Sequence, residues 1–409
     1  MKFLRSKFLL IATAFVFILF MTNDFGLVNI ERTAIIMAIG IDFDKENKEY
    51  EVTAQIAIPE PSSTASGENN DSLISEKGKT IASAIDKIGI NTGWYPMLSF
   101  CNLVLIGNSL LEQNVMESIN YFVRTDKIQD SAYIATCDGK AKDFLSSSTP
   151  LDSISSLTIQ KILGKDIAKL DRIANISIKN FVQMYYSKSK SGYMPLLKKI
   201  KVEKSPEGSS GGSSSGGSSG GSNGTSDKQG KDQYVFDATY TSIFSDGYMV
   251  ETLTPEETLM FNIKHKNALD TYISLDEIEI NGKKTSAMLG VNEHTKKYKF
   301  KIENGLPVYC IDLNFYCKFE DANMQVDVSN LNPTAEIPKE VLKIAEEKIT
   351  KTINDLFDKL KRSKCDLFQV EDALYQKYYS HYSKLSGLTL EKLQLKATIK
   401  CQSEKSTRL

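Results

Sequence analysis

Histidine and tryptophan are scarce in this sequence, and cysteine occurs at no metal-binding spacing. The 409 residues contain one tryptophan and three histidines, His265, His294 and His381. No two histidines stand at H-x-x-x-H or similar spacing, so we expect surface or partly packed side chains and no metal ligands. The six cysteines form no C-x-x-C pair and no disulfide framework, which favours buried free thiols. They are Cys101, Cys137, Cys310, Cys317, Cys365 and Cys401.

An excess of charge of either sign is also lacking. Lysine and arginine number 50 and the acids 51, for a formal net charge of -1. The two signs are interspersed along the chain, so no basic field exists to attract nucleic acid. We therefore predict no nucleic-acid partner.

Sequence motifs for phosphate or dinucleotide binding are incomplete. Gly78-Lys79-Thr80 resembles the end of a P-loop, but Leu73 stands where the first glycine is required, and a helix N-terminus fits better. Residues 38–42 (AIGID) contain one glycine, too few for a dinucleotide fingerprint, so Asp42 is expected to end a strand or cap a turn. The sequence therefore predicts no catalytic, cofactor-binding or metal-binding residues and no cofactor. It also predicts that the protein is not an enzyme.

An apolar segment follows a basic N-terminus. Lys2, Arg5 and Lys7 precede an uncharged run at residues 8–21, the pattern of a secretory signal or signal anchor. By the positive-inside rule the rest of the chain is exported. No A-x-A-like site follows the run, and the first cysteine is Cys101, so no lipobox is present. An uncleaved anchor at 1–28 is favoured, although 14 helical residues span only ~21 Å of a ~30 Å hydrocarbon core. A cleaved signal with an unusual site stays open as the alternative.

A Ser/Gly-rich segment divides the remainder. Residues 207–230 (EGSSGGSSSGGSSGGSNGTSDKQG) cannot form a core and are typical of a flexible connection. We predict a domain at 29–204, a linker at 205–233 and a second domain at 234–409.

Strands and helices alternate in the first predicted domain. An apolar run at 35–42 and an alternating run at 50–58 predict adjacent strands, the first buried on both faces. Helices are expected at 81–88 and 110–123, strands at 100–106 and 131–137, and mainly helix and loop at 157–200. This pattern predicts a mixed α/β domain.

The second predicted domain is α+β. Ser245-Asp246-Gly247 is expected to turn a hairpin between strands at 238–244 and 248–253, and residues 309–319 alternate as a strand that buries Cys317. Pro338 opens a long helix whose apolar stripe is Leu342, Ala345, Ile349, Ile353, Leu356 and Leu360. A last strand at 393–399 carries a basic face of Lys392, Lys396 and Lys400, either a contact surface or a solvated edge. The predicted fold class is therefore a multi-domain mixed α/β and α+β extracytoplasmic protein with an N-terminal membrane anchor.

Two sets of aromatic residues are candidates for contact surfaces. Trp94 and Tyr95 lie beside Pro96 in a loop-like stretch, and Tyr375, Tyr378, Tyr379 and Tyr382 fall near one side of a helix. Packing into the core is the favoured interpretation of both groups, and a contact surface is the alternative.

These segments together resemble the Ger(x)C family, the C subunits of spore germinant receptors. The resemblance runs through IIMAIGIDFD and a strand in which Gln55 and Pro59 match Q-x-x-x-P, and continues through Gly107 and Arg124. After the linker it includes Glu257-Thr258 and the segment KLKRSKCDLFQVEDALYQKYY with Asp366. Two departures are clear. Asp24 and Phe25 stand where the family has a lipobox cysteine and tryptophan, and the Ser/Gly insert is longer than usual.

The resemblance implies a non-enzymatic subunit of a nutrient receptor on the outer face of the spore inner membrane. Its implied partners are a germinant receptor A subunit, a permease-like B subunit and the membrane, while the small-molecule ligand is unknown. The alternative function is a membrane-anchored envelope solute-binding or chaperone-like protein.

Overall fold

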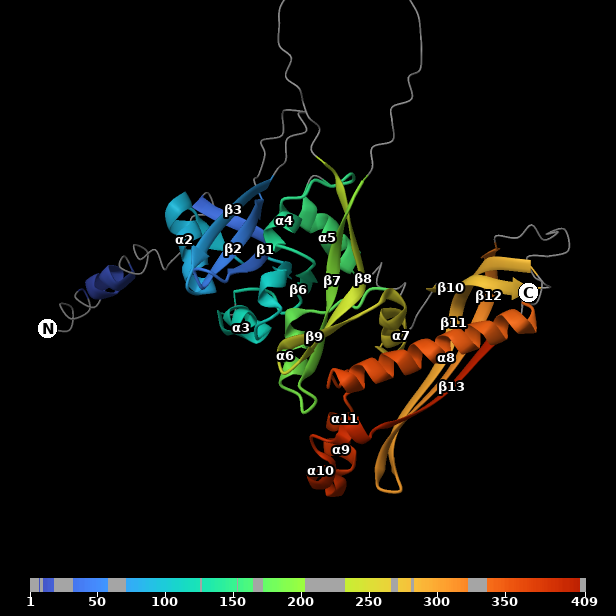
Figure 1. The fold of residues 1–409 in the computed structure, drawn as a ribbon. Coiled ribbons are helices and arrows are strands. Elements are labelled where there is room, and N and C mark those ends of the chain that lie inside the picture. Colours follow the sequence, from blue (N-terminus) through green and yellow to red (C-terminus); the bar gives the residue numbers. More distant parts are fainter. Residues whose placement is uncertain are drawn as a thin grey trace, which may run out of the picture.

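The computed structural model describes residues 7, 10–17, 32–57, 71–125, 127–152, 154–164, 172–202, 232–265, 271–280, 283–322 and 337–404. Most of the predicted anchor (1–28) and of the predicted linker (205–233) lies outside these residues. The described chain forms two β-sheets with helices, a mixed α and β architecture, and the sheets stand at opposite ends of an elongated molecule (Figure 1).

The first sheet has nine strands in the order β3-β2-β1-β5-β6-β7-β8-β9, with β4 paired to β1. Strands β1, β5, β6 and β7 are parallel, while β2, β3, β8 and β9 are antiparallel to their neighbours. The strands are β1 (Thr33–Asp44), β2 (Glu49–Ala57), β3 (Asp71–Gly78), β4 (Tyr95–Met97), β5 (Leu103–Ile106), β6 (Tyr133–Cys137), β7 (Ser191–Lys201), β8 (Tyr234–Ser245) and β9 (Tyr248–Leu253).

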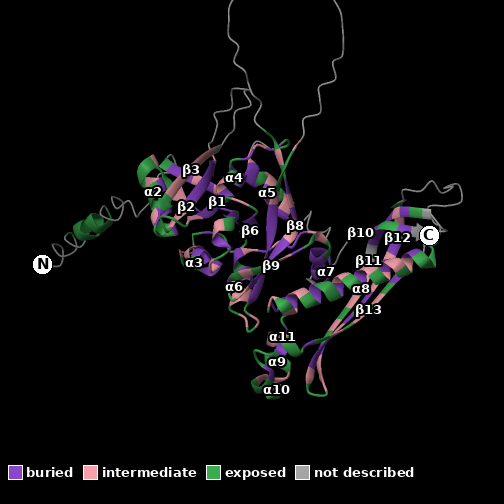
Figure 2. Cartoon of the chain, in the orientation of Figure 1, coloured by how far each residue is buried: buried purple, intermediate pink, exposed green. Residues whose placement is uncertain are grey.

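Helices cover both faces of the first sheet, as the continuous apolar runs of its parallel strands require. In β5, Val104 and Ile106 join the core under α2, α3 and α6, while Leu103 and Leu105 join the core under α4 and α5. Figure 2 shows the resulting burial of the central strands. The helices are α2 (Ile81–Thr92), the short 3-10 helix η2 (Asn108–Leu110), α3 (Val115–Thr125), α4 (Ala141–Leu145), α5 (Ser155–Leu163) and α6 (Ile178–Tyr185).

The first sheet continues across the Ser/Gly-rich segment. Strands β7 and β8 pair antiparallel up to Lys201 and Tyr234, and the N–H of Val202 donates to the carbonyl oxygen of Gln233 at 2.9 Å. Residues 203–232 therefore connect two neighbouring strands. The predicted boundary at 205–233 lies inside the first sheet rather than between the two sheets.

The second sheet has the order β10-β11-β12-β13, and α8 packs along it. Its last strand, β13, runs parallel to β12 because α8 carries the chain back along the sheet between the two strands. The elements after β9 are α7 (Pro255–His265), β10 (Thr271–Ile280), β11 (Lys283–Glu303), β12 (Leu306–Ala322), α8 (Lys339–Arg362), α9 (Val370–Lys377), α10 (Tyr379–Leu385), α11 (Thr389–Lys392) and β13 (Gln394–Ser403).

Several predicted elements are confirmed in the second half. Asp246 and Gly247 take positive φ values of 50° and 84° in the β8–β9 turn, the conformation that such a two-residue hairpin needs. Pro338 is the N-cap of α8, and the predicted stripe is buried except for the half-buried Leu342. Cys317 is buried on β12.

One strand was missed and one residue was misplaced. Residues 157–200 are mainly helix and loop as expected, but β7 occupies 191–201. Pro195 lies within β7, where its carbonyl oxygen accepts a bond from the Thr136 hydroxyl of β6 at 3.2 Å, and β8 pairs on the other side. Lys392 was assigned to the last strand and instead ends α11; on β13, Lys396 and Lys400 are exposed.

Candidate functional site

The carboxylate of Asp42 caps a helix inside the first sheet. Asp42 lies near the end of β1, and its two oxygens accept the backbone N–H groups of Ala141 (2.9 Å) and Lys142 (3.1 Å) at the start of α4. Burial raises the pKa of this carboxyl, and the two N–H groups oppose that rise because they stabilise the charged form. A helix N-terminus at this edge of a sheet commonly receives a ligand anion. Here the protein's own carboxylate occupies it.

Gly107 makes room for that carboxylate. It follows β5, and its N–H donates to the carbonyl oxygen of Ile41 at 2.8 Å. A Cβ atom on Gly107 would lie 1.8 Å from Oδ1 of Asp42, far inside van der Waals contact. Asp42 and Gly107, distant in sequence, are therefore two halves of one packing arrangement.

Gln55 joins β2 to the α4–α5 connection in the same layer. Its side chain is buried, Nε2 donates to the carbonyl oxygen of Leu145 at 3.4 Å, and Oε1 accepts the N–H of Ser156 at 3.3 Å. Like Asp42, it satisfies backbone groups that would otherwise be buried without partners.

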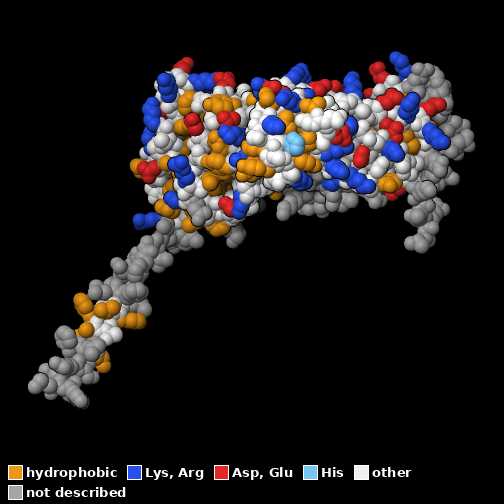
Figure 3. All heavy atoms as spheres, turned by 90° about the horizontal axis from the view of Figure 1, so that it is seen from below, with side chains coloured by type: hydrophobic (Ala, Val, Ile, Leu, Met, Phe, Trp, Pro, Cys, Tyr) orange, Lys and Arg blue, Asp and Glu red, His pale blue; other side chains and the backbone are white. Residues whose placement is uncertain are grey.

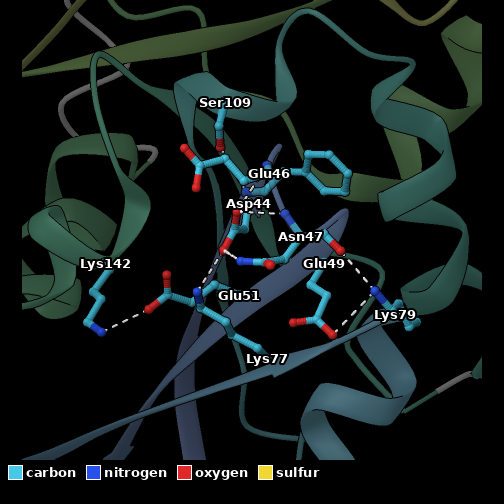
Figure 4. A network of polar contacts seen from close by, with 10 residues as sticks. Asp44, Glu46, Asn47, Glu49, Glu51, Lys77, Lys79, Ser109 and Lys142 are labelled. Atoms are coloured by element: carbon cyan, nitrogen blue, oxygen red, sulfur yellow. Dashed lines mark hydrogen bonds and ion pairs between the residues drawn. The ribbon is translucent and has the colours of Figure 1, made fainter.

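A solvated ion-pair network surrounds the β1–β2 turn (Figure 4). Asp44 accepts bonds from Lys77 (2.8 Å) and from the backbone and side chain of Asn47, which hold the pKa of its carboxyl well below the usual range. Lys79 pairs with Glu49 at 3.5 Å, and Lys142 with Glu51 at 2.9 Å. These partly exposed ion pairs hold the β1–β2 turn against β3 and α4.

A second buried carboxylate, Asp366, connects the two sheets. It sits in the turn between α8 and α9, where its oxygens accept the N–H groups of Val370 (3.0 Å) and Glu371 (2.9 Å). Its Oδ2 also accepts the hydroxyl of Ser189 (2.7 Å), just before β7, and its own N–H donates to Ser191 Oγ (2.8 Å). Burial raises the pKa of Asp366 against these bonds. This clamp, which we call the junction, ties the α8–α9 turn to the first sheet.

Further polar contacts reinforce the junction. Asp372 of α9 accepts the N–H groups of Lys188 (3.0 Å) and Ser189 (3.1 Å). Lys359 of α8 pairs with Glu257 of α7 at 2.6 Å, and both side chains are largely buried. Helix α7 lies between the sheets in Figure 1, so these contacts join elements from both halves of the chain.

Lys264 is a half-buried cation beside the junction. Its ammonium donates to the carbonyl oxygen of Phe368 at 2.9 Å and lies 5.1 Å and 5.6 Å from the ring centroids of Phe368 and Tyr309. Burial lowers its pKa to about 8, a shift that the charge of Asp366 partly offsets. Neither Lys264 nor Ser189 carries a signal in the sequence, because their partners lie about a hundred residues or more away.

The histidines and the Gly78-Lys79-Thr80 segment considered as candidate sites lie in different parts of the fold. His294 stacks on Phe315, His381 lies beside Ser380, and the side chain of His265 falls outside the described part. Thr80 is the N-cap of α2, which confirms a helix N-terminus after Gly78-Lys79. Across the described ranges no group of three or more His, Cys, Asp or Glu side chains is placed to hold a metal ion.

The six cysteine thiols are free in the structure, and all but the half-buried Cys310 are buried. Burial raises the pKa of Cys101 and of Cys365 to about 12. A thiol with so high a pKa is protonated at neutral pH and is a poor nucleophile.

Both aromatic groups are more exposed than core packing predicted. Trp94 and Tyr95 are each 46% exposed, and Tyr379 is 68% exposed while it stacks with Tyr382. Tyr378 and Tyr382 do pack against the core of the second half. Figure 3 shows Lys and Arg interspersed with Asp and Glu over the face it presents, beside a gathering of hydrophobic side chains.

Two protein-family models match the sequence of this chain. The model described as "Spore germination protein N-terminal domain" matches residues 27–199, and "Spore germination B3/ GerAC like, C-terminal" matches residues 239–402. The two matches cover most of a chain whose fold is a two-sheet mixed α and β architecture. The chain belongs to the Ger(x)C family of spore germination proteins.

Two relatives of known name agree with this assignment. Spore germination protein KC of Bacillus subtilis (strain 168) is 23% identical over 370 residues, 86% of this chain and 83% of that protein. Spore germination protein B3 of the same organism is 28% identical over 148 residues, 36% of this chain and 38% of that protein. The crystal structure of the GerBC protein has a TM-score of 0.49 at 17% identity, covering 89% of this chain and 96% of that one.

Part of the predicted membrane anchor is described by the structure. Residues 10–17 are helical, and Leu10, Ile11, Phe15, Val16 and Phe17 are exposed. Among the residues that the structure describes, none of the helices combines the length and apolar composition needed to span a bilayer.

Proposed function

We propose that this chain acts in spore germination as the C subunit of a nutrient germinant receptor. It is held on the outer face of the spore inner membrane by its N-terminal apolar segment, and it works by binding A- and B-type receptor subunits. Family membership carries the proposal, because both family domains match in order along one chain.

The use of the family-matching polar residues supports a non-enzymatic role. Asp42, Gln55 and Asp366 each bind backbone groups of the protein itself, at distances of 2.9–3.4 Å. A catalytic carboxylate needs an open side facing a substrate. These side chains instead hold distant segments together, as expected in a protein that presents a fixed surface to partners.

A deletion strain tests the proposal. Spores that lack the gene are expected to lose the response to at least one nutrient, and the wild-type gene is expected to restore it. Affinity purification of the full chain from spore membranes is expected to bring down permease-like and A-type subunits.

Normal germination with every nutrient, in a strain with no other such receptor, would contradict the proposal. Tight binding of a small solute by the purified chain, without co-purifying subunits, would favour an envelope solute-binding protein instead.

A further inference from the structure

An exposed apolar surface lies at one end of the first sheet, outside both polar sites. It consists of large side chains from the end of α2, from β4 and from the segments on either side of β4, each at least 46% exposed. We call it the aromatic edge: Ile90, Trp94, Tyr95 and Phe100. Apolar side chains scattered singly over a surface are normal, whereas several gathered in one region mark a contact.

The backbone holds the aromatic edge in a fixed conformation. Gly93 ends α2 at a φ of 72°, and its N–H donates to the carbonyl oxygen of Gly89 at 2.9 Å. The N–H of Trp94 donates to the Thr92 hydroxyl at 3.3 Å, and Gln129 Nε2 donates to the carbonyl oxygen of Ser99 beside Phe100 at 3.1 Å. The aromatic rings are thus presented by ordered turns.

A shallow groove runs between these rings. It is lined by Ile90, Trp94 and Tyr95 on one side and by Tyr121 and Lys127 on the other. Lys127 is exposed at its rim, and Arg124 is exposed in the last turn of α3. Tryptophan and tyrosine rings with nearby lysine or arginine are the composition that proteins place at the boundary between lipid tails and headgroups.

The aromatic edge adjoins the point where the N-terminal segment enters the fold. Tyr95 pairs with Thr33, the first residue of β1. Thr33 lies 12 residues after Met21, the end of the apolar run, and 12 residues reach at most ~40 Å. If residues 8–21 are in a bilayer, Thr33 beside the aromatic edge therefore lies within about 40 Å of its surface.

We propose that the aromatic edge inserts its rings into the headgroup region of the membrane and fixes the orientation of the first sheet on the bilayer. The proposal rests on the membrane attachment proposed above. The competing occupant of the groove is the apolar segment 8–21 folded back onto its own chain, which would bury the same rings without lipid.

The sole tryptophan makes a direct test available. The full chain is reconstituted into phosphatidylcholine vesicles with brominated or unbrominated acyl chains, and vesicle flotation reports attachment. Bromine quenches tryptophan only at close range, so we expect Trp94 emission to fall in brominated vesicles and to shift to shorter wavelength on vesicle binding.

A matched probe controls for non-specific adsorption. Tyr248, 48% exposed, lies on β9, five strand spacings or about 24 Å from β1 across the sheet. The chain carrying Trp94→Phe and Tyr248→Trp is expected to float equally well and to show no quenching. The double substitution Tyr95→Ser and Phe100→Ser is expected to float but to reduce quenching of Trp94.

Each other outcome has a defined meaning. Flotation without quenching of Trp94 overturns the inference and leaves the attachment intact, and a blue-shifted but unquenched Trp94 identifies the folded-back segment. Equal quenching of both probes would show that the aromatic edge makes no specific contact with the membrane, and it would also overturn the inference. Absence of flotation removes the attachment and the inference with it.

Discussion

At the scale of single residues, the buried carboxylates of this protein accept hydrogen bonds from backbone N–H groups. Asp42 and Asp366 each receive two N–H groups from the start of a helix, and both link segments distant in sequence. A buried charge is tolerated only where such bonds replace water, so the geometry around each carboxylate has little freedom. Substitutions that intrude on this space test how much stability it carries.

Gly107→Ala is expected to destabilise the first sheet by about 2–3 kcal/mol, the upper range for overpacking. The new methyl group would overlap Asp42 Oδ1 and force the carboxylate from its N–H donors. The measurement is the midpoint of urea unfolding. Gly305→Ala is the control: its φ is +77° but nothing lies near, so only the backbone term of about 1 kcal/mol applies. Equal losses for both variants would contradict the steric argument.

Lys264 predicts a pH dependence of stability. Its pKa falls from 10.5 in the unfolded chain to about 8 in the folded protein, so above pH 8 the unfolded state binds more protons. The free energy of unfolding should therefore rise between pH 8 and 9, by at most about 1 kcal/mol from this group.

Lys264→Met removes the titrating group and is expected to abolish that rise. Urea unfolding at the two pH values measures it. The effect is taken as the difference between wild type and variant, because the raised pKa values of the buried Cys101 and Cys365 thiols lower the stability of both proteins as the pH approaches 9. A rise that persists in the variant would assign it to another group.

Some of these residues could be predicted from sequence and others could not. Asp42 ends an apolar run before a polar turn, so it was expected to end a strand or cap a turn. It lies instead within β1 and caps a helix whose first residue is 99 residues away. Ser189 and Lys264 lie in segments without periodicity or motif. Their roles arise only when the chain folds, since each meets partners about a hundred or more residues distant.

At the scale of elements, the predictions from sequence were correct where the sequence pattern that defines the element is local. The β8–β9 hairpin depends on two turn residues, and α8 on a stripe with helical spacing, so both were predictable. Strand β7 was missed because its pattern is interrupted by Pro195 and ends in lysines, and its place in the sheet is set by β6 and β8. The pairing of β7 with β8 across a long Ser/Gly segment had no local signal at all.

That pairing predicts the effect of shortening the connection. Deleting residues 209–224 is expected to leave the fold intact and to raise stability by about 0.5 kcal/mol, because a shorter loop loses less entropy on closure. Thermal unfolding measures the change. Deleting residues 236–240 of β8 is the control and should unfold the first sheet. A fall of several degrees in melting temperature for the loop deletion would show that this segment contributes contacts.

At the scale of the whole molecule, the proposed membrane attachment rests on residues 8–21. Phe15→Asp with Ile18→Asp adds roughly 5 kcal/mol or more to insertion and is expected to shift the chain from the membrane to the soluble fraction. Phe15→Leu with Ile18→Leu keeps the segment apolar and is the control. Membrane fractionation and N-terminal sequencing give the readout. A mature N-terminus between residues 22 and 28 would contradict a retained anchor.

The continuity of the first sheet across the Ser/Gly segment also orders how the chain folds during synthesis. Strands β1 to β7 emerge first, but the outer edge of β7 has no partner until β8 follows some thirty residues later. An unpaired strand edge invites pairing with other chains, and long-range pairing is slow. The interval between completion of β7 and of β8 is thus when a newly made chain is most exposed to aggregation.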